Sequence, residues 1–191
     1  SSRRRHTRSS VESRGLGDVY KRQTQGTIVS DSDIACYCRP EHGNHILVGS
    51  EDPECDPHQW VEDDTDYNRE FTDQWTTQAM RYAQRVPSLG IPGRTRGVVD
   101  LYDASTDWIP IYDKSSLPGF YMACGTSGNQ YKNAPIAGKL MAALVGYCED
   151  GNDHDTAPLA FEMPYIGRSI DAGFYSRKRP INSESSFSVL G

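Results

Sequence analysis

Two short segments near the start of the chain alternate apolar and polar residues. Residues 33–39 (DIACYCR) and 45–50 (HILVGS) each read as a strand, and the PEHGN stretch between them contains Gly43 and Asn44, a pair typical of tight turns. We therefore expect an antiparallel hairpin here. Residues 51–67 are acidic and contain proline, which indicates a surface loop.

A helix is predicted from the pattern that follows. Apolar residues recur at helical spacing over residues 69–86 (REFTDQWTTQAMRYAQRV), and the pattern stops at Pro87. Proline disfavours the helical conformation of the residue before it, so we expect the helix to end there. The expected buried stripe consists of Phe71, Trp75, Gln78, Met80, Tyr82 and Val86.

The most informative pattern lies further along. Residues 97–103 (GVVDLYD) and 108–112 (WIPIY) predict two strands joined by an ASTD turn. An apolar strand (FYMAC), a glycine-containing loop (GTSGNQYKNAP) and an apolar helix (IAGKLMAALVGY) then follow in order within residues 117–147. This succession is used where a backbone must approach a ligand closely. The remainder, 148–191, is polar.

Composition narrows the class of protein. Of the 191 residues, 36% are hydrophobic and 24% are charged, which provides a core and argues against a mainly disordered chain. The apolar runs are far shorter than a membrane span, so we expect none. The net charge of −6 gives little support to nucleic-acid binding.

Cysteine and histidine usage suggests neither disulfides nor metal. The five cysteines are odd in number, which favours reduced thiols and a cytoplasmic location. Cys36 and Cys38 would point to one face of their strand as ordinary small residues. The histidines are scattered over loops and the acidic runs lack EF-hand spacing, so we expect no metal site.

Residues 1–23 have a different charge from the rest of the chain. They hold seven basic and two acidic residues, whereas residues 24–191 carry a net charge of −11. Residues 18–23 (DVYKRQ) are the translation of GATGTGTATAAGAGACAG, the transposon end of a sequencing-library adapter, and residues 2–8 and 13–17 match other parts of that adapter in order. We therefore expect residues 1–23 to be a translated adapter from a metagenomic read and no part of the fold. On this interpretation the natural sequence enters in mid-chain near Thr24.

The glycine-containing loop offers candidate chemistry. Gly125 and Gly128 are spaced GxxG, which taken alone also fits an ordinary strand-to-helix turn. Lys132 adds a full positive charge where the following helix begins and already carries a partial one. Such a corner suits an anion, or a group that becomes anionic during a reaction. Lys132 by itself also fits a solvated surface lysine.

A second candidate lies on the hairpin. Tyr37, Arg39 and Glu41 are spaced two apart, so they share a face of the strand if the alternation holds. An arginine in this position can hold a carboxylate through two parallel hydrogen bonds, although strand arginines are also commonly exposed.

Three segments of the chain resemble the C-terminal half of the FAD-dependent amine and amino-acid oxidoreductases. This family includes D-amino-acid oxidase, glycine oxidase, sarcosine oxidase and dimethylglycine dehydrogenase. The segments are 37–52 (YCRPEHGNHILVGSED), 96–113 (RGVVDLYDASTDWIPIYD) and 117–145. The last is similar to the family's strand ending in Gly, followed by SGxGxK, AP and a helix. The likeness is greatest to the sarcosine oxidase and dimethylglycine dehydrogenase branch.

The resemblance implies a fold and a cofactor. It implies an α+β (α/β) fragment in which residues 24–98 form part of an antiparallel-sheet substrate domain. Residues 99–191 would form the end of that domain and the strand, loop and helix that return to a Rossmann-like FAD-binding domain. Family members bind the ADP half of FAD through an N-terminal GxGxxG motif, which does not occur in this sequence. We therefore expect a fragment inactive alone, whose partner is the missing N-terminal half.

The same resemblance implies site residues. The candidates for flavin contact are Gly125, Thr126, Ser127, Gly128, Asn129, Gln130, Tyr131 and Lys132. Lys132 matches the family lysine near the flavin and the substrate carboxylate, so it is also a candidate for catalysis and substrate binding. Tyr102 falls where some relatives have an active-site tyrosine, although a half-buried strand tyrosine fits equally. Tyr37 and Arg39 are candidates for substrate binding.

Two departures from the family pattern bear on the site. Asp100 stands where monomeric sarcosine oxidases carry the cysteine that tethers FAD, so we expect FAD to be held without a covalent bond. Asn129 stands in place of the family's usual histidine, which leaves the substrate open.

Two kinds of function fit these observations. The first is part of an enzyme that oxidises the C–N bond of a small amino acid or N-methyl amine, similar to glycine, sarcosine or dimethylglycine. The alternative is a non-catalytic binding or subunit module associated with a flavoprotein. A GxGxxG motif upstream of Thr24, with an acidic residue about twenty positions on, would favour the enzyme.

Overall fold

The computed structural model describes most of the chain. The described residues are 2–12, 27–41, 45–51, 53, 55, 59–90 and 95–189, with residues 2–12 described for the backbone only. The chain divides into two compact units, one comprising residues 3–101 and the other consisting mainly of residues 102–191. Each unit is described by itself below.

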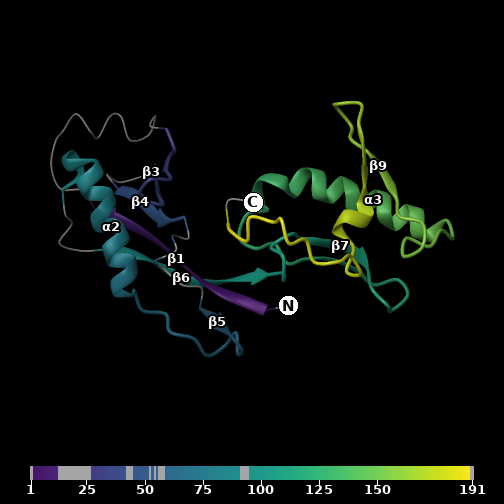
Figure 1. Ribbon diagram of the computed structural model, residues 1–191, viewed down its shortest axis with the longest axis horizontal. Coiled ribbons are helices and arrows are strands. Elements are labelled where there is room, and N and C mark those ends of the chain that lie inside the picture. Colours follow the sequence, from purple (N-terminus) through teal and green to yellow (C-terminus); the bar gives the residue numbers. More distant parts are fainter. Residues whose placement is uncertain are drawn as a thin grey trace. The chain divides into compact units, whose positions relative to one another are not determined.

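The described residues of the first unit form an antiparallel sheet, helix α2 and the short 3-10 helix η1 (Pro87–Leu89) (Figure 1). The strand order is β2-β3-β4-β1-β5, and β6 also pairs with β1. The strands are β1 (Ser2–Glu12), β2 (Val29–Asp31), β3 (Cys36–Glu41), β4 (His45–Ser50), β5 (Trp60–Val61) and β6 (Thr95–Ala104). The predicted hairpin is confirmed, because β3 and β4 pair antiparallel with Tyr37 opposite Gly49 and Glu41 opposite His45. Its turn, residues 42–44, lies outside the described residues.

Helix α2 (Asp73–Arg85) begins four residues later than the pattern predicts. The Thr72 side chain accepts a hydrogen bond from the Trp75 N–H at 3.2 Å, so it caps the helix at this point. The helix ends before Pro87, as expected. Trp75, Gln78 and Tyr82 form its buried face. Met80, which the stripe included, is exposed.

The core of this unit lies between α2 and the β3–β4 hairpin, which lie side by side in Figure 1. Cys36, Cys38, Val48 and Tyr82 are buried against one another. The two cysteines point to one face of β3 as expected, and the Cys36 thiol donates to Gln78 Oε1 at 3.0 Å. Burial raises the pKa of Cys36 to about 11, so this thiol is unreactive near neutral pH. All five cysteines are free thiols.

Strand β1 lies within the segment that the sequence analysis attributes to an adapter. It pairs antiparallel with β4, with Arg8 opposite Gly49 and Glu12 opposite His45. The structure thus places in the sheet a segment expected to lie outside the fold. Strand pairing uses backbone hydrogen bonds that every residue except proline can complete, so it does not identify the origin of a segment. The adapter origin stays a prediction, tested below.

The second unit is built around α3 (Ala134–Glu149) and the antiparallel pair β7 (Ile111–Lys114) and β8 (Tyr121–Cys124). In the pair, Ile111 lies opposite Cys124 and Lys114 opposite Tyr121. A second pair, β9 (Ala160–Glu162) with β10 (Ser169–Asp171), follows α3. Tyr112, Leu140, Phe161 and Ala172 form the core, which places α3 against β7 (Figure 1).

Two features of this unit differ from the sequence prediction. The strand predicted at 108–112 begins only at Ile111, because Trp108 adopts a left-handed conformation with φ of 61° that a strand cannot continue through. The polar remainder also contains the β9–β10 pair and the short 3-10 helix η3 (Ala172–Tyr175), which sequence patterns did not predict. The expected class, an α+β fold with antiparallel sheet, is confirmed. None of the described helices is long and apolar enough to cross a membrane.

Candidate functional site

The glycine-containing loop connects β8 to the short 3-10 helix η2 (Tyr131–Asn133) and then α3. Its backbone is left-handed at three of four successive residues, with φ of 66° at Gly125, 50° at Ser127 and 78° at Gly128. Glycine adopts such angles without strain, whereas other residues do so at a cost. The loop therefore has a specific, tightly turned shape.

Tyr102 packs directly against this loop. A Cβ atom added to Gly128 would lie 2.5 Å from the Tyr102 ring, which is shorter than any allowed contact. Gly128 is therefore required both for its backbone angle and for space. The structure thus brings Tyr102 together with the loop candidates, through a contact that the spacing of residues did not reveal.

The end of β6 also holds the loop through Asp103, the residue that follows Tyr102. The Asp103 carboxylate accepts hydrogen bonds from the Gly125 N–H at 2.8 Å and from the Thr126 hydroxyl. The Asp103 carbonyl accepts from the Ser127 N–H at 3.1 Å. Ala104 and Thr126 also form an antiparallel bridge. Sequence reasoning missed Asp103, whose only signal was its place beside a candidate tyrosine.

A chain of hydrogen bonds continues from the loop into the core of this unit. The buried Ser127 hydroxyl accepts from the Ser105 N–H at 3.4 Å, and the Ser105 hydroxyl donates to the Asp107 carboxylate at 3.2 Å. Arg179 binds that carboxylate through two nitrogens, at 2.6 and 3.1 Å. Burial by itself would raise the pKa of Asp107, but the hydrogen bonds from Arg179, Asn182 and Ile109 outweigh it and lower the pKa to about 2.

The second half of the loop is held by amide side chains. Gln130 Oε1 accepts from the Tyr112 hydroxyl at 3.0 Å and from the Asn133 side chain at 3.0 Å. The Gln130 amide in turn donates to Asn129, whose side chain is almost fully buried. Asn129, Gln130 and Asn133 therefore hold η2 in place below its exposed residues.

Lys132 and Tyr131 face outward from η2. Tyr131 is 98% exposed, and Lys132 is also exposed. Within the part of the chain that the structure describes, Lys132 makes no hydrogen bond or ion pair. Asn133 leads into α3 without a side-chain capping bond, so the positive end of the helix is not neutralised by a side chain. This cation and helix terminus suit an anionic or electron-rich ligand.

The hairpin candidates belong to the other unit. Arg39 forms an ion pair with Glu41 at 2.7 Å, which confirms that these two residues share a face of β3. The guanidinium is thus already bound to one carboxylate. The Tyr37 ring lies over Gly49, where an added Cβ would approach it within 2.2 Å. Asp100 accepts from the Tyr67 hydroxyl at 3.3 Å and from the Leu101 N–H at 2.8 Å.

Arginines near the end of the chain form buried ion pairs that sequence reasoning missed. Arg177 binds the fully buried Asp113 at 2.9 Å and Asp155 at 2.9 Å. Hydrogen bonds from Arg177 hold the pKa of Asp155 far below its ordinary value. Buried His154 accepts the Leu159 N–H at Nδ1 and lies 3.8 Å from Asp113. In the sequence, the only indication of these ion pairs is that aspartates cluster elsewhere in the chain.

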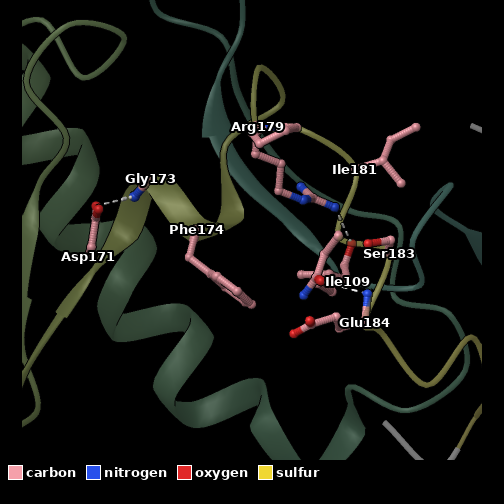
Figure 2. A pocket seen from close by; sticks show the side chains of 10 residues that line it. Ile109, Asp171, Gly173, Phe174, Arg179, Ile181, Ser183 and Glu184 are labelled. Carbon is pink, nitrogen blue, oxygen red and sulfur yellow. Dashed lines mark hydrogen bonds between the residues drawn. The ribbon is translucent and has the colours of Figure 1, made fainter.

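A pocket of about 570 Å³ is lined in part by Arg179, the partner of Asp107 (Figure 2). Its lining residues are Ile109, Asp171, Gly173, Phe174, Arg179, Pro180, Ile181, Asn182, Ser183 and Glu184. Phe174 points toward the side where Ile109 and Glu184 lie, while Asp171 turns away to accept the Gly173 N–H at 2.8 Å. None of the site residues predicted from sequence is among the lining residues.

Comparison with known proteins extends these observations. Residues 5–144 match the model of the family described as FAD dependent oxidoreductase. Among solved structures, the fold is similar to that of glycine oxidase from Geobacillus kaustophilus, with a TM-score of 0.55 and 17% sequence identity. That likeness covers 94% of this chain and 40% of the glycine oxidase chain. No curated protein matches the sequence.

Proposed function

Because this chain belongs to the family of FAD-dependent oxidoreductases, we propose that its β8–α3 loop, residues 125–132, contacts the flavin ring. The observation that carries this proposal is the loop itself. Its left-handed backbone at Gly125 and Gly128 is held from beneath by Asp103, and Lys132 stands exposed and unneutralised where the helix begins. The donor set fits a flavin, whose ring carries carbonyl and nitrogen acceptors and gains negative charge when it takes up electrons.

We propose further that the holoenzyme oxidises the C–N bond of a small amino acid or N-methyl amine. FAD, when bound, would supply the two-electron acceptor for this oxidation, and water would hydrolyse the imine product. Lys132 supplies a positive charge that can orient a substrate carboxylate and stabilise negative charge on the ring. Tyr102, packed on Gly128, shapes the same corner. In the other unit, Arg39 is a separate candidate: a substrate carboxylate could replace Glu41 on its guanidinium.

We propose also how the rest of FAD is held and where the protein is located. The 191 residues contain no GxGxxG motif, so contacts to the ADP half of FAD come from another polypeptide segment. Asp100 is not a cysteine, which supports FAD held without a covalent bond. A cytoplasmic location is consistent with the five free thiols.

The loop can be tested in the chain by itself. Riboflavin and ADP are titrated separately while the backbone amides of residues 124–136 are followed by NMR. We expect riboflavin to shift these amides with weak affinity, because only the ring contacts are present, and we expect no shift with ADP. Unshifted loop amides with riboflavin would contradict the flavin role and favour the non-catalytic module. The substrate class is tested in the holoenzyme by anaerobic flavin reduction with glycine, sarcosine and dimethylglycine.

A further inference from the structure

Asp103 is distinctive because its carboxylate is occupied entirely by loop groups. Its oxygens accept from the Gly125 N–H at 2.8 Å and from the Thr126 hydroxyl. No cation of the described chain lies within ion-pair distance of this carboxylate. Hydrogen bonds to a charged acceptor are stronger than those to a neutral one, so this half-buried carboxylate is a firm anchor.

The anchor acts where the loop is most strained. Gly125, Ser127 and Gly128 are all left-handed, and the serine in particular adopts this conformation at a cost. Asp103 holds three successive loop residues, since its carboxylate binds Gly125 and Thr126 while its carbonyl accepts from the Ser127 N–H at 3.1 Å. Without these bonds the loop would be free to relax toward ordinary backbone angles.

The neighbouring strand residue acts on the same loop. Tyr102 and Asp103 are consecutive in β6, and the Tyr102 ring packs on Gly128 while the Asp103 carboxylate binds Gly125, three residues earlier in the loop. The end of β6 therefore holds the loop at both ends of its strained segment. Tyr102 offers an apolar contact that can slide, whereas Asp103 offers directional bonds that cannot.

We propose that Asp103 is the positioning residue of the flavin loop: it does not touch the ligand, but it sets the backbone shape on which flavin contact depends. This inference rests on the proposed function for the part that concerns flavin. The part that concerns the loop stands without it. Asparagine at this position can retain both links, because its oxygen accepts from Gly125 and its amide donates to the Thr126 oxygen.

The test compares Asp103→Ala and Asp103→Asn in the full chain. Asp171→Ala is the matched control, because Asp171 also accepts a glycine N–H at 2.8 Å, from Gly173, at another place in the same unit. Amide hydrogen exchange is measured at residues 125–128 without any flavin. We expect Asp103→Ala to speed exchange there about tenfold to a hundredfold, the size of losing a hydrogen bond to a carboxylate. Asp103→Asn keeps both links but loses the charge, so it should speed exchange less than Asp103→Ala, and Asp171→Ala should leave exchange unchanged.

Riboflavin titration then connects the loop to the ligand. We expect the riboflavin Kd of Asp103→Ala to rise roughly threefold or more, because fewer molecules hold the binding shape. Unchanged exchange in Asp103→Ala, or equal damage from Asp103→Asn, would overturn the positioning role. Faster exchange with an unchanged riboflavin Kd would overturn its importance for flavin. If the parent chain fails to bind riboflavin, the proposed function fails, and the exchange data still decide the role of Asp103 in the loop.

A variant that fails to fold does not end the test. Thr126→Val preserves the shape of the side chain and removes the hydroxyl donor to Asp103. We expect a smaller rise in exchange at Gly125 than in Asp103→Ala, with the melting temperature close to that of the parent. No rise in this variant, together with none in Asp103→Asn, would refute the anchor.

Discussion

Lys132 is exposed at the start of α3, and in the described part of the chain it has no partner that would hold its charge. Replacing it with methionine keeps the bulk and removes the charge. In the holoenzyme we expect flavin reduction by substrate to slow by roughly 10²–10³, the size of comparable electrostatic groups. The melting temperature should barely change, because a solvated lysine contributes little to stability. Stopped-flow absorbance of the flavin measures the step.

A matched control lies on α3, the helix that follows η2. Lys139 is also exposed, and its amine lies 4.6 Å from the centre of the Tyr165 ring. Lys139→Met removes a charge from α3 without touching the loop, so flavin reduction should keep its parental rate. If Lys132→Met were equally fast, Lys132 would be a surface residue only.

A second prediction at the residue scale concerns Gly128 and the free energy of unfolding. Gly128→Ala adds a Cβ at φ of 78° and 2.5 Å from the Tyr102 ring, so we expect it to lower the free energy of unfolding by about 1–3 kcal/mol. Gly138→Ala is the control, because nothing lies within 4 Å of the added Cβ and alanine favours the helix. That variant should gain about 0.5–1 kcal/mol. Urea unfolding compares the two, and equal effects would contradict the packing described.

The site could be predicted from the sequence only in part. Gly125, Gly128 and Lys132 stand out because two glycines and a cation occur together where an apolar strand connects to an apolar helix, although each alone also fits an ordinary turn or surface position. Asp103 and Arg179 do not stand out, because their partners lie over twenty and over seventy residues away in the chain. A hydrogen bond between distant positions leaves no local pattern, so only the fold reveals it.

At the scale of elements, boundaries were set by single side chains. The periodic pattern located α2 correctly, but its start depends on the Thr72 cap, and the start of β7 depends on the left-handed Trp108. The β3–β4 hairpin could be read from alternation, since one of its faces is buried against α2. The β9–β10 pair could not, because its strands are three residues long and mostly exposed.

Asp107, in the turn between β6 and β7, predicts how the stability of the second unit depends on pH. The pKa of Asp107 is lowered to about 2 in the fold from its ordinary value of 3.8, so the unfolded chain binds the proton more readily. The stabilisation by this carboxylate is therefore complete above about pH 4 and is lost as the pH falls toward 2. It amounts to roughly 2 kcal/mol for a shift of this size.

Urea unfolding at pH 7, 4 and 3 checks this, with Asp107→Asn alongside the parent. We expect the difference between the two proteins to shrink as the pH falls through this window. Glu162→Gln is the control, because Glu162 is exposed and makes no ion pair within the described residues. A difference between parent and Asp107→Asn that stayed constant from pH 7 to 3 would show that Asp107 is not the group that titrates.

At the scale of the whole molecule, residues 1–23 have two interpretations, which predict different effects of deleting them. The adapter interpretation predicts that deleting them leaves expression and melting temperature unchanged. The pairing of Ser2–Glu12 with β4 predicts a loss, because removing a paired central strand exposes its neighbours. We expect the deletion to be neutral. A fall of several degrees, measured by differential scanning calorimetry, would show that β1 belongs to the fold.

The buried arginines impose an order on how the second unit can be made. Among the described residues, Arg179 and Arg177 are the arginine partners of Asp107 and Asp113, and both come more than sixty residues later in the chain. Until the ribosome has passed residue 179, the nascent unit carries carboxylates whose places in the interior cannot yet be neutralised. Its strands and helix α3 emerge first, but they cannot complete the folded unit until both arginines have been synthesised. Synthesis that stops before Arg177 therefore yields a product suited to proteolysis rather than a smaller folded unit.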